Sequence, residues 1–220
     1  MPEYVLASPV ETTFALAFLL ADPATYVHVS VSLLRIIVGF SAAALVGVPI
    51  GCLAGSFRTA GLTVLPLNSA ARYIPPTAFI GLVIIWFGIG EGSKVFLIAL
   101  AVVFYLVQMS ADVISGVPRV YREAALALGA TSWEVFARVQ LRSSVGDLLA
   151  VLRVNLGAAW TYLIVAEVVA AQSGLGYLIA VSQRFVQTPR LFALLVIIGC
   201  VGFGTDRLLA IAIRVANRWR

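Results

Sequence analysis

Long apolar stretches separated by short polar ones form the dominant pattern along this chain. A helix needs about 20 apolar residues to cross the roughly 30 Å hydrocarbon core of a bilayer. Five stretches are long enough to cross it: about 28–57, 62–87, 94–115, 148–171 and 191–215. The shorter run 14–21 ends at Asp22-Pro23 and predicts a helix that lies in the membrane interface. The pattern therefore predicts an all-α, polytopic membrane helix bundle of about five transmembrane helices.

Prolines and glycines mark special positions in the first two spans. Pro75 and Pro76 remove two backbone donors from the second span, so its helix must break or kink there. A kink that lines a pore and a kink that only serves packing are both consistent with this pattern. In the first span Gly47, Gly51 and Gly55 recur at every fourth position, which lets another helix approach closely. We favour a packing face here over a moving hinge near Pro49.

The longest polar interruption covers residues 119–142. Apolar positions before and after Gly129 repeat with helical spacing, which predicts two short amphipathic helices joined at that glycine. Glycine readily adopts the left-handed conformation that ends many helices. Thr131 or Ser132 can cap the second helix, and Trp133 lies on its apolar face.

This interruption resembles the signature loop of the permease subunits of bacterial ABC importers. The matching residues are Glu123-Ala124-Ala125, Gly129 and Val139-Gln140-Leu141. The strings SLLRIIVGF, WFGIGEGSKVFLIAL, AAWTYLIVAEVVAA and SGLGYLI resemble the nitrate, sulfonate, taurine and bicarbonate branch of that family. The family usually has a proline after the leucine, whereas this chain has Arg142, which leaves the end of the second helix open.

The resemblance implies a cytoplasmic coupling loop at 117–145 that docks on separate ATPase subunits. The residues expected to carry this coupling are Glu123, Ala124, Ala125, Gly129, Val139 and Leu141. We expect Glu123 to cap the loop or to form a salt bridge with Arg119 or Arg122.

The resemblance also implies a set of partners in a bacterial inner membrane. They are a second permease copy in a homodimer, two ABC ATPase subunits that hold ATP and magnesium, an extracytoplasmic solute-binding protein and the surrounding lipid. The chain itself would bind no cofactor. Its cargo would be a small anion such as nitrate, bicarbonate, taurine or an alkanesulfonate. The alternative is a self-sufficient secondary carrier or channel, which repeated halves with matching broken helices would favour. The sequence shows no second proline-kinked span.

Charge sets the expected orientation. Apolar residues make up 61% of the chain, charged residues 11%, and the net charge is +5. Residues 1–27 carry no lysine or arginine, whereas arginines concentrate around 119–142 and at the C-terminus. By the positive-inside rule, 1–27 is an extracytoplasmic segment, 28–216 the transmembrane permease domain and 217–220 a cytoplasmic tail. No long basic run suggests nucleic-acid binding.

Candidate chemistry is confined to a few ionisable groups within the spans. No nucleophile-base set, carboxylate pair, Cys/His cluster or phosphate-binding loop is present, so we expect a non-catalytic subunit without a metal site. Cys52 and Cys200 lie in apolar segments, and His28 is expected at the membrane surface. Charges within a membrane usually pair or line a cavity. Arg35 therefore either forms a structural ion pair with Glu167 or attracts an anionic substrate. Asp112 and Asp206 are expected to pair with arginines near the cytoplasmic side. Candidate residues for the translocation path are Arg35, Pro75, Pro76, Trp86, Trp160 and Glu167.

Overall fold

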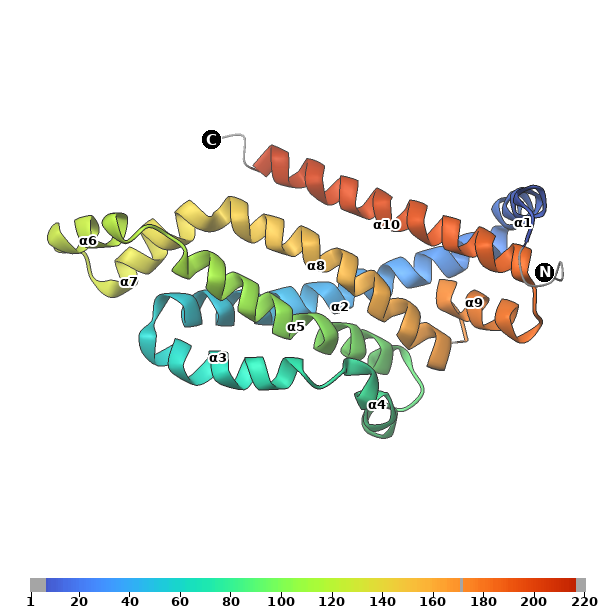
Figure 1. The fold of residues 1–220 in the computed structure, drawn as a ribbon, viewed down its shortest axis with the longest axis horizontal. Helices are drawn as coiled ribbons and strands as arrows, with labels where there is room; N and C mark the ends of the chain where they lie inside the picture. Colours follow the sequence, from blue (N-terminus) through green and yellow to red (C-terminus); the bar gives the residue numbers. More distant parts are fainter. Residues whose placement is uncertain (1–6, 171, 217–220) are drawn as a thin grey trace.

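The structure is a computed structural model that describes residues 7–170 and 172–216, and the regular elements of that part are all helices. They are α1 (Pro9–Ala21), α2 (Pro23–Ser56), α3 (Arg58–Arg72), η1 (Pro76–Phe79), α4 (Ile80–Phe87), α5 (Glu91–Ser115), α6 (Arg119–Ala127), α7 (Ser132–Glu134), η2 (Val135–Gln140), α8 (Leu141–Ala170), α9 (Leu175–Arg184) and α10 (Thr188–Ala216). Figure 1 shows an elongated bundle with α6 and α7 at one end and α1 and α9 at the other. The predicted all-α class is confirmed. Ala171 and the predicted tail 217–220 lie outside the described residues.

Four helices are long and apolar enough to cross a membrane: α2, α5, the continuous helix Ser132–Val169 and α10. The predicted second span is bent by 81° between Arg58–Arg72 and Pro76–Phe87, and it is the fifth span if both parts are counted as one. The break lies at Pro75-Pro76, as expected from the backbone donors that these residues lack. This chain is therefore a multi-pass membrane protein.

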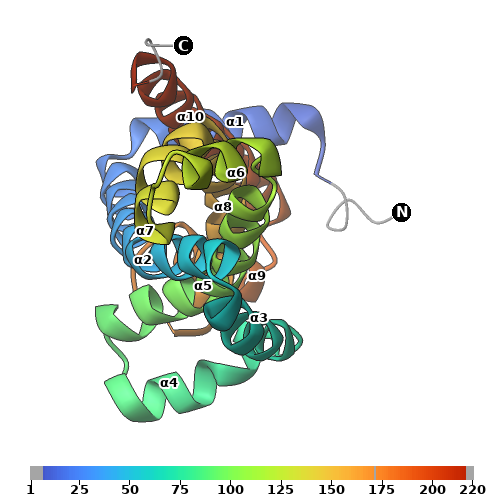
Figure 2. The same cartoon turned by 90° about the vertical axis from the view of Figure 1, so that its left-hand side faces the viewer.

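The first span begins at Pro23, earlier than the predicted start at residue 28. The side chain of Asp22 accepts a hydrogen bond from the Ala24 N–H at 3.0 Å, and proline at the first helical position fits the helix without needing a donor. Asp22 also ends α1, the helix predicted to lie in the interface. Figure 2 shows α1 lying crosswise to α10, on which it packs with Leu19 buried.

The centre of the bundle is the packing of α2 on α5, and α8 packs against both of them. Glycines on one face of α2 permit the close approach that the sequence predicts. A Cβ at Gly51 would run into the backbone of Val107, and a Cβ at Gly55 would run into that of Ala111. Since α2 stays helical through Pro49, the glycine face serves packing.

The predicted second short helix of the 119–142 region does not end near Arg142. It continues from α7 through the six-residue π-helix η2 into α8, so that one helix covers Ser132–Val169. Arginine at 142 keeps the backbone N–H that proline would lack, and nothing else in this stretch stops a helix. The predicted turn at Gly129 is confirmed, with φ of 86°.

Candidate functional site

Several apolar side chains are exposed on α6 and on the turn after it, although this region is the most polar stretch of the sequence. Val120, Tyr121, Leu126 and Leu128 expose 63%, 56%, 49% and 89% of their surface, and Trp133 exposes 59%. Glu123 lines a hollow of about 380 Å³ with Arg119, Arg122 and Leu126. Exposed apolar side chains beside arginines are typical of a surface that docks another protein. We call residues 119–134 the docking loop.

The turn of the docking loop is held by backbone geometry. The Gly129 N–H donates to the Leu126 carbonyl at 2.9 Å, and the Ala130 N–H donates to the Ala125 carbonyl at 3.1 Å. These two bonds with a left-handed glycine form a Schellman motif. Thr131 then caps the next helix: its side chain accepts from the Glu134 N–H, and Glu134 accepts from the Thr131 N–H. The expected helix cap is thus confirmed.

The six residues of the family signature are only partly brought together. Ala125, Gly129 and Val139 line one hollow of about 340 Å³. Leu141 instead packs inward against the buried cluster of Cys52, Ile114, Phe136 and Leu148. Glu123 and Ala124 lie on α6. Glu123 lines the separate hollow formed with Arg119, Arg122 and Leu126.

The expected salt bridge of Glu123 does not form within the described residues. The ion pair of this region joins Glu134 to Arg138 at 3.4 Å, one turn apart on the following helix. A spacing of four residues on a helix suits the Glu134–Arg138 pair. Arg119 has the same spacing from Glu123, but the two line the hollow without a bond between them.

Aromatic stacking and two polar contacts anchor the docking loop to the bundle. The Phe136 ring lies 5.1 Å from Trp133 and 5.6 Å from Phe57, measured between centroids. Ser56 donates to Gln140 Oε1 at 2.5 Å, and Gln140 Nε2 donates to the Ile114 carbonyl at 3.4 Å. The base of the loop is therefore tied to the adjacent ends of α2 and α5.

An ion-pair network lies at the opposite end of the bundle, with Arg35 and Glu167 buried and Glu91 exposed at its edge. Arg35 Nη1 donates to Glu167 at 2.7 Å, and Arg35 Nε and Nη2 donate to the two carboxylate oxygens of Glu91 at 2.5 and 2.6 Å. Arg35 is 2% exposed and Glu167 is fully buried. Lys94 adds a second cation to Glu91 at 2.9 Å. The structural ion pair of Arg35 with Glu167 is thus present, and all three guanidinium nitrogens of Arg35 donate hydrogen bonds within the protein.

The same network holds the chain where α8 turns into α9. Glu167 accepts from Ser32 Oγ and from the Gly176 N–H, each at 2.8 Å at the closest oxygen. Gly174, with φ of 109°, leaves the space that the Glu167 carboxylate fills, since a Cβ there would overlap it. His28 Nδ1 accepts from the Gly174 N–H at 3.0 Å. Sequence reasoning missed Glu91, Lys94 and Ser32; the only signal for the first two was their place in a glycine-rich turn between spans.

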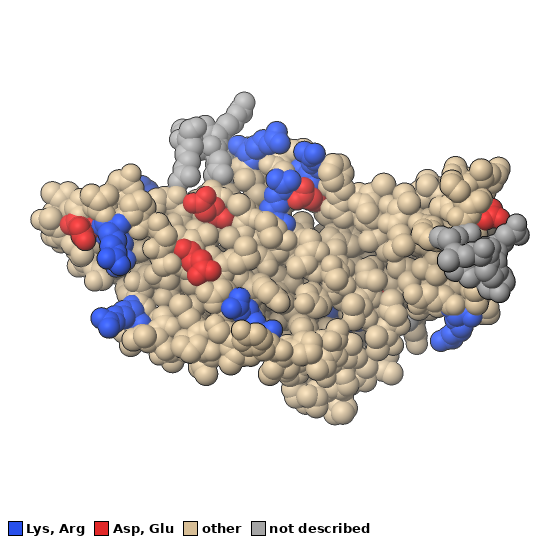
Figure 3. All heavy atoms as spheres, in the orientation of Figure 1, with Lys and Arg blue, Asp and Glu red and all other residues tan. Residues whose placement is uncertain are grey.

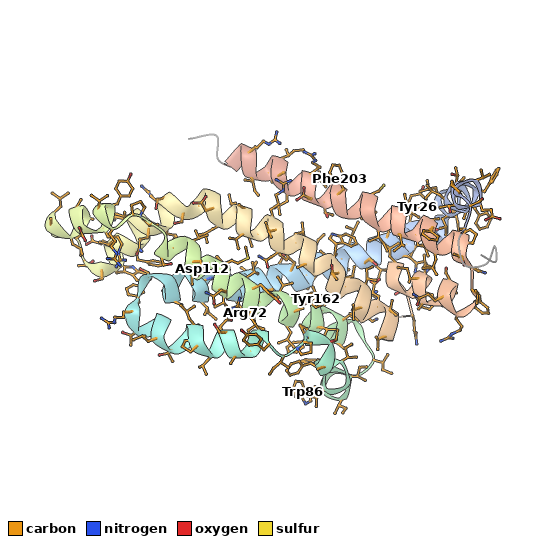
Figure 4. All side chains as sticks on the ribbon, in the orientation of Figure 1. Tyr26, Arg72, Trp86, Asp112, Tyr162 and Phe203 are labelled. Carbon is orange, nitrogen blue, oxygen red and sulfur yellow. The ribbon has the colours of Figure 1, made fainter. Side chains whose placement is uncertain are left out.

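The other candidate path residues do not converge with Arg35. Trp86, labelled in Figure 4, lies on α4 and is 61% exposed. Trp160 is 7% exposed and donates from Nε1 to Thr205 at 3.1 Å. Pro75 is the last residue before η1, and Pro76 is the first residue of η1. Asp206 pairs with Arg153 through two bonds of 2.6 Å, as expected. The expectation for Asp112 was wrong: it accepts from Gln108 one turn away rather than from an arginine.

Comparisons with known proteins agree with this geometry. Residues 47–215 match the family described as binding-protein-dependent transport system inner membrane component. A probable ABC transporter permease protein of Brucella abortus is 37% identical over 98% of this chain and 86% of its own length. The taurine transport system permease protein TauC of Escherichia coli is 36% identical over 90% of this chain and 70% of its own. The putative aliphatic sulfonates transport permease protein SsuC of Bacillus subtilis is 33% identical over 98% and 78%.

A solved structure shows the same fold. A chain of the inward-facing MetNI methionine ABC transporter superposes with a TM-score of 0.72 at 20% identity, covering 88% of this chain and 99% of that one. The matched family region, the relatives and the fold all describe the same kind of membrane subunit. This chain therefore belongs to the binding-protein-dependent transport system inner membrane component family, the permease subunits of ABC importers.

Proposed function

We propose that this permease imports a small anion that an extracytoplasmic solute-binding protein delivers. Relatives named for taurine and aliphatic sulfonates support this, as does the nitrate import permease protein NrtB of Synechocystis, which is 27% identical over 86% of this chain. Nitrate and sulfonate groups are both compact oxyanions. The permease works as a homodimer around one translocation path, in a bacterial inner membrane.

In the proposed mechanism, ATP hydrolysis belongs to two separate ATPase subunits, which hold ATP and magnesium and dock on the docking loop. The loop faces the cytoplasm and residues 1–27 face outward. Two properties support this placement: the arginine bias of the loop and its exposed apolar side chains, which suit a protein contact better than water. The subunit itself carries out no chemical step.

The observation that carries the proposal is the continuous helix from the docking loop to the buried network. Helix Ser132–Val169 has 38 residues, a length of about 57 Å. It starts at the loop and holds Glu167 near its far end, where Glu167 contacts Arg35 of α2. A push on the loop therefore reaches the opposite end of the bundle through one backbone. ATPase closure would use this helix to switch the bundle between inward-open and outward-open states.

Gly129 offers a sharp test because its surroundings are empty. A Cβ there would meet no atom of this chain within 4 Å, so within the permease a substitution changes mainly the backbone preference at φ of 86°. A β-branched residue in this conformation costs about 1–2 kcal/mol, whereas asparagine tolerates it. We expect Gly129→Val to lose most substrate-stimulated ATP hydrolysis and uptake, and Gly129→Asn to keep both.

The measurement uses complexes of permease, ATPase and solute-binding protein in lipid vesicles, with membrane abundance checked for each variant. Normal coupling in a fully assembled Gly129→Val complex would contradict the role of the loop. The rival function, a self-sufficient carrier, predicts uptake by the permease alone. Vesicles that hold the permease without any ATPase are expected to show none, and gradient-driven uptake in them would overturn the proposal.

A further inference from the structure

A groove of about 470 Å³ runs between α8 and α10 on the outside of the bundle. Trp160 and Leu156 line its wall on α8, and Ile198 and Phe203 line its wall on α10. Three glycines widen it by leaving out side chains: Gly157, Gly199 and Gly202. In the most apolar 18-residue stretch of α10 only 17% is buried, against 50% in the corresponding stretch of α5. Helix α10 therefore has much apolar surface open to an additional partner.

Charged side chains close one end of this groove. Arg153 of α8 and Asp206 of α10 form a two-bond ion pair across it. Arg207 lies over the Phe203 ring, 4.8 Å from its centroid, and Arg214 follows two helical turns later on the same face. Three arginines and one aspartate leave two positive charges at this end. Figure 3 shows basic side chains, with acidic ones among them, gathered over the C-terminal part of α10.

The place of Arg153 along α8 puts this basic end in the docking-loop half of the hydrocarbon core. Asp147 and Glu167 of α8 are 20 residues apart, which corresponds to about 30 Å, the thickness of that core. Arg153 lies six residues inside Asp147. Helix side chains lean toward the helix N-terminus, and arginines extend along apolar surface toward water. The Arg153 guanidinium is therefore directed toward the lipid headgroups on the side of the docking loop.

We propose that this groove binds an anionic phospholipid of the leaflet on the docking-loop side. One acyl chain lies along Trp160 between the two helices, and the headgroup phosphate is bound by Arg207 beside the Arg153–Asp206 pair, with Arg214 adding positive charge further along α10. The apolar walls fit the chain, and the net positive end fits the negative headgroup. A second copy of this chain fits less well, because a twofold contact at the groove would bring two sets of the same arginines together.

The glycines give a matched pair of variants. A Cβ at Gly199 or at Gly204 would meet no atom within 4 Å, so a side chain added at either position begins in open space. Gly199 lines the groove and Gly204 does not, although both lie on α10. Arg207→Gln tests the headgroup contact, and Arg184→Gln at the opposite end of the bundle is its control.

The experiment is native mass spectrometry of the permease complex purified from vesicles of phosphatidylglycerol and phosphatidylcholine in equal amounts. We expect the wild type, Gly204→Leu and Arg184→Gln to retain phosphatidylglycerol over phosphatidylcholine. Gly199→Leu and Arg207→Gln are expected to lose at least five-fold of that retention, at unchanged complex assembly.

Three results would overturn the proposal. The first is unchanged phosphatidylglycerol retention in Gly199→Leu and Arg207→Gln. The second is efficient cross-linking between two copies through Gly199→Cys, which would identify a second copy as the occupant. The third is displacement of the bound lipid by inorganic phosphate alone, which would show an anion site that does not use the apolar groove.

Discussion

Removal of the Arg35 guanidinium is expected to cost more stability than loss of any other single charge in the described bundle. Glu167 is fully buried and would keep only its bonds from Ser32 and the Gly176 N–H. A buried carboxylate that loses its cation destabilises a protein by about 3–5 kcal/mol. For a chain of this size each kcal/mol shifts the melting temperature by about 2–4 °C. We therefore expect Arg35→Gln to lower the melting temperature by about 6–20 °C.

The comparison variants separate charge from geometry. Arg35→Lys retains a positive charge but lacks the planar group that contacts Glu91 and Glu167 at once. Its melting temperature is therefore expected to lie between those of the wild type and Arg35→Gln. Arg138→Gln removes an arginine whose side chain is 76% exposed, and little change is expected. The assay is thermal unfolding followed by tryptophan fluorescence in one detergent, with uptake measured at equal abundance. Arg35→Gln melting within 1 °C of the wild type would refute the structural role of the network.

Three further predictions follow from local geometry. Gly51→Leu is expected to lower the melting temperature by several degrees, because a Cβ there runs into the backbone of α5. Gly204→Leu is expected to leave the melting temperature unchanged, and equal melting temperatures of the two variants would contradict the packing role of the glycine face. Thr131→Ala removes a helix cap worth about 1 kcal/mol, so amide exchange at 132–134 is expected to rise about five-fold, and unchanged exchange would show that the cap is dispensable. Ala24→Cys is expected to react with an impermeant maleimide in intact cells and Ser132→Cys is not; the opposite result would reverse the orientation.

The features that sequence predicted well are those fixed by local physics. Span length depends only on the number of apolar residues between charges, and four spans with one broken pair agree with the five expected. Gly51 faces α5 because small residues at every fourth position make one face of a helix. Gly129 ends α6 because few other residues adopt its left-handed conformation. Each of these signals lies within one continuous stretch of the chain.

The features that sequence missed depend on contacts across the bundle. Glu91 lies 56 residues from Arg35 in a glycine-rich turn, and its side chain is 61% exposed. Only the packing of α2 on α5 brings the two together. Glu123 has arginines at suitable spacing, yet the structure places no bond between them in the described residues, because spacing shows what can pair and not what does. The sequence does not decide where the helix that contains Arg142 ends, because the absence of a stop residue is a weaker signal than the presence of one.

The π-helix η2 explains how one helix can serve both the docking loop and the bundle. A π-turn takes more residues than an α-turn, and here Val135, Phe136 and Gln140 are all buried toward the bundle. That widened face lets Phe136 join the apolar cluster while Gln140 reaches Ser56 and the Ile114 carbonyl. Because π-turns are strained relative to α-turns and are tolerated mainly where function requires them, the bending of Ser132–Val169 under load is expected to concentrate here. In the proposed mechanism, the contacts of Gln140 with α2 and α5 would carry part of that load into the two helices whose packing forms the centre of the bundle.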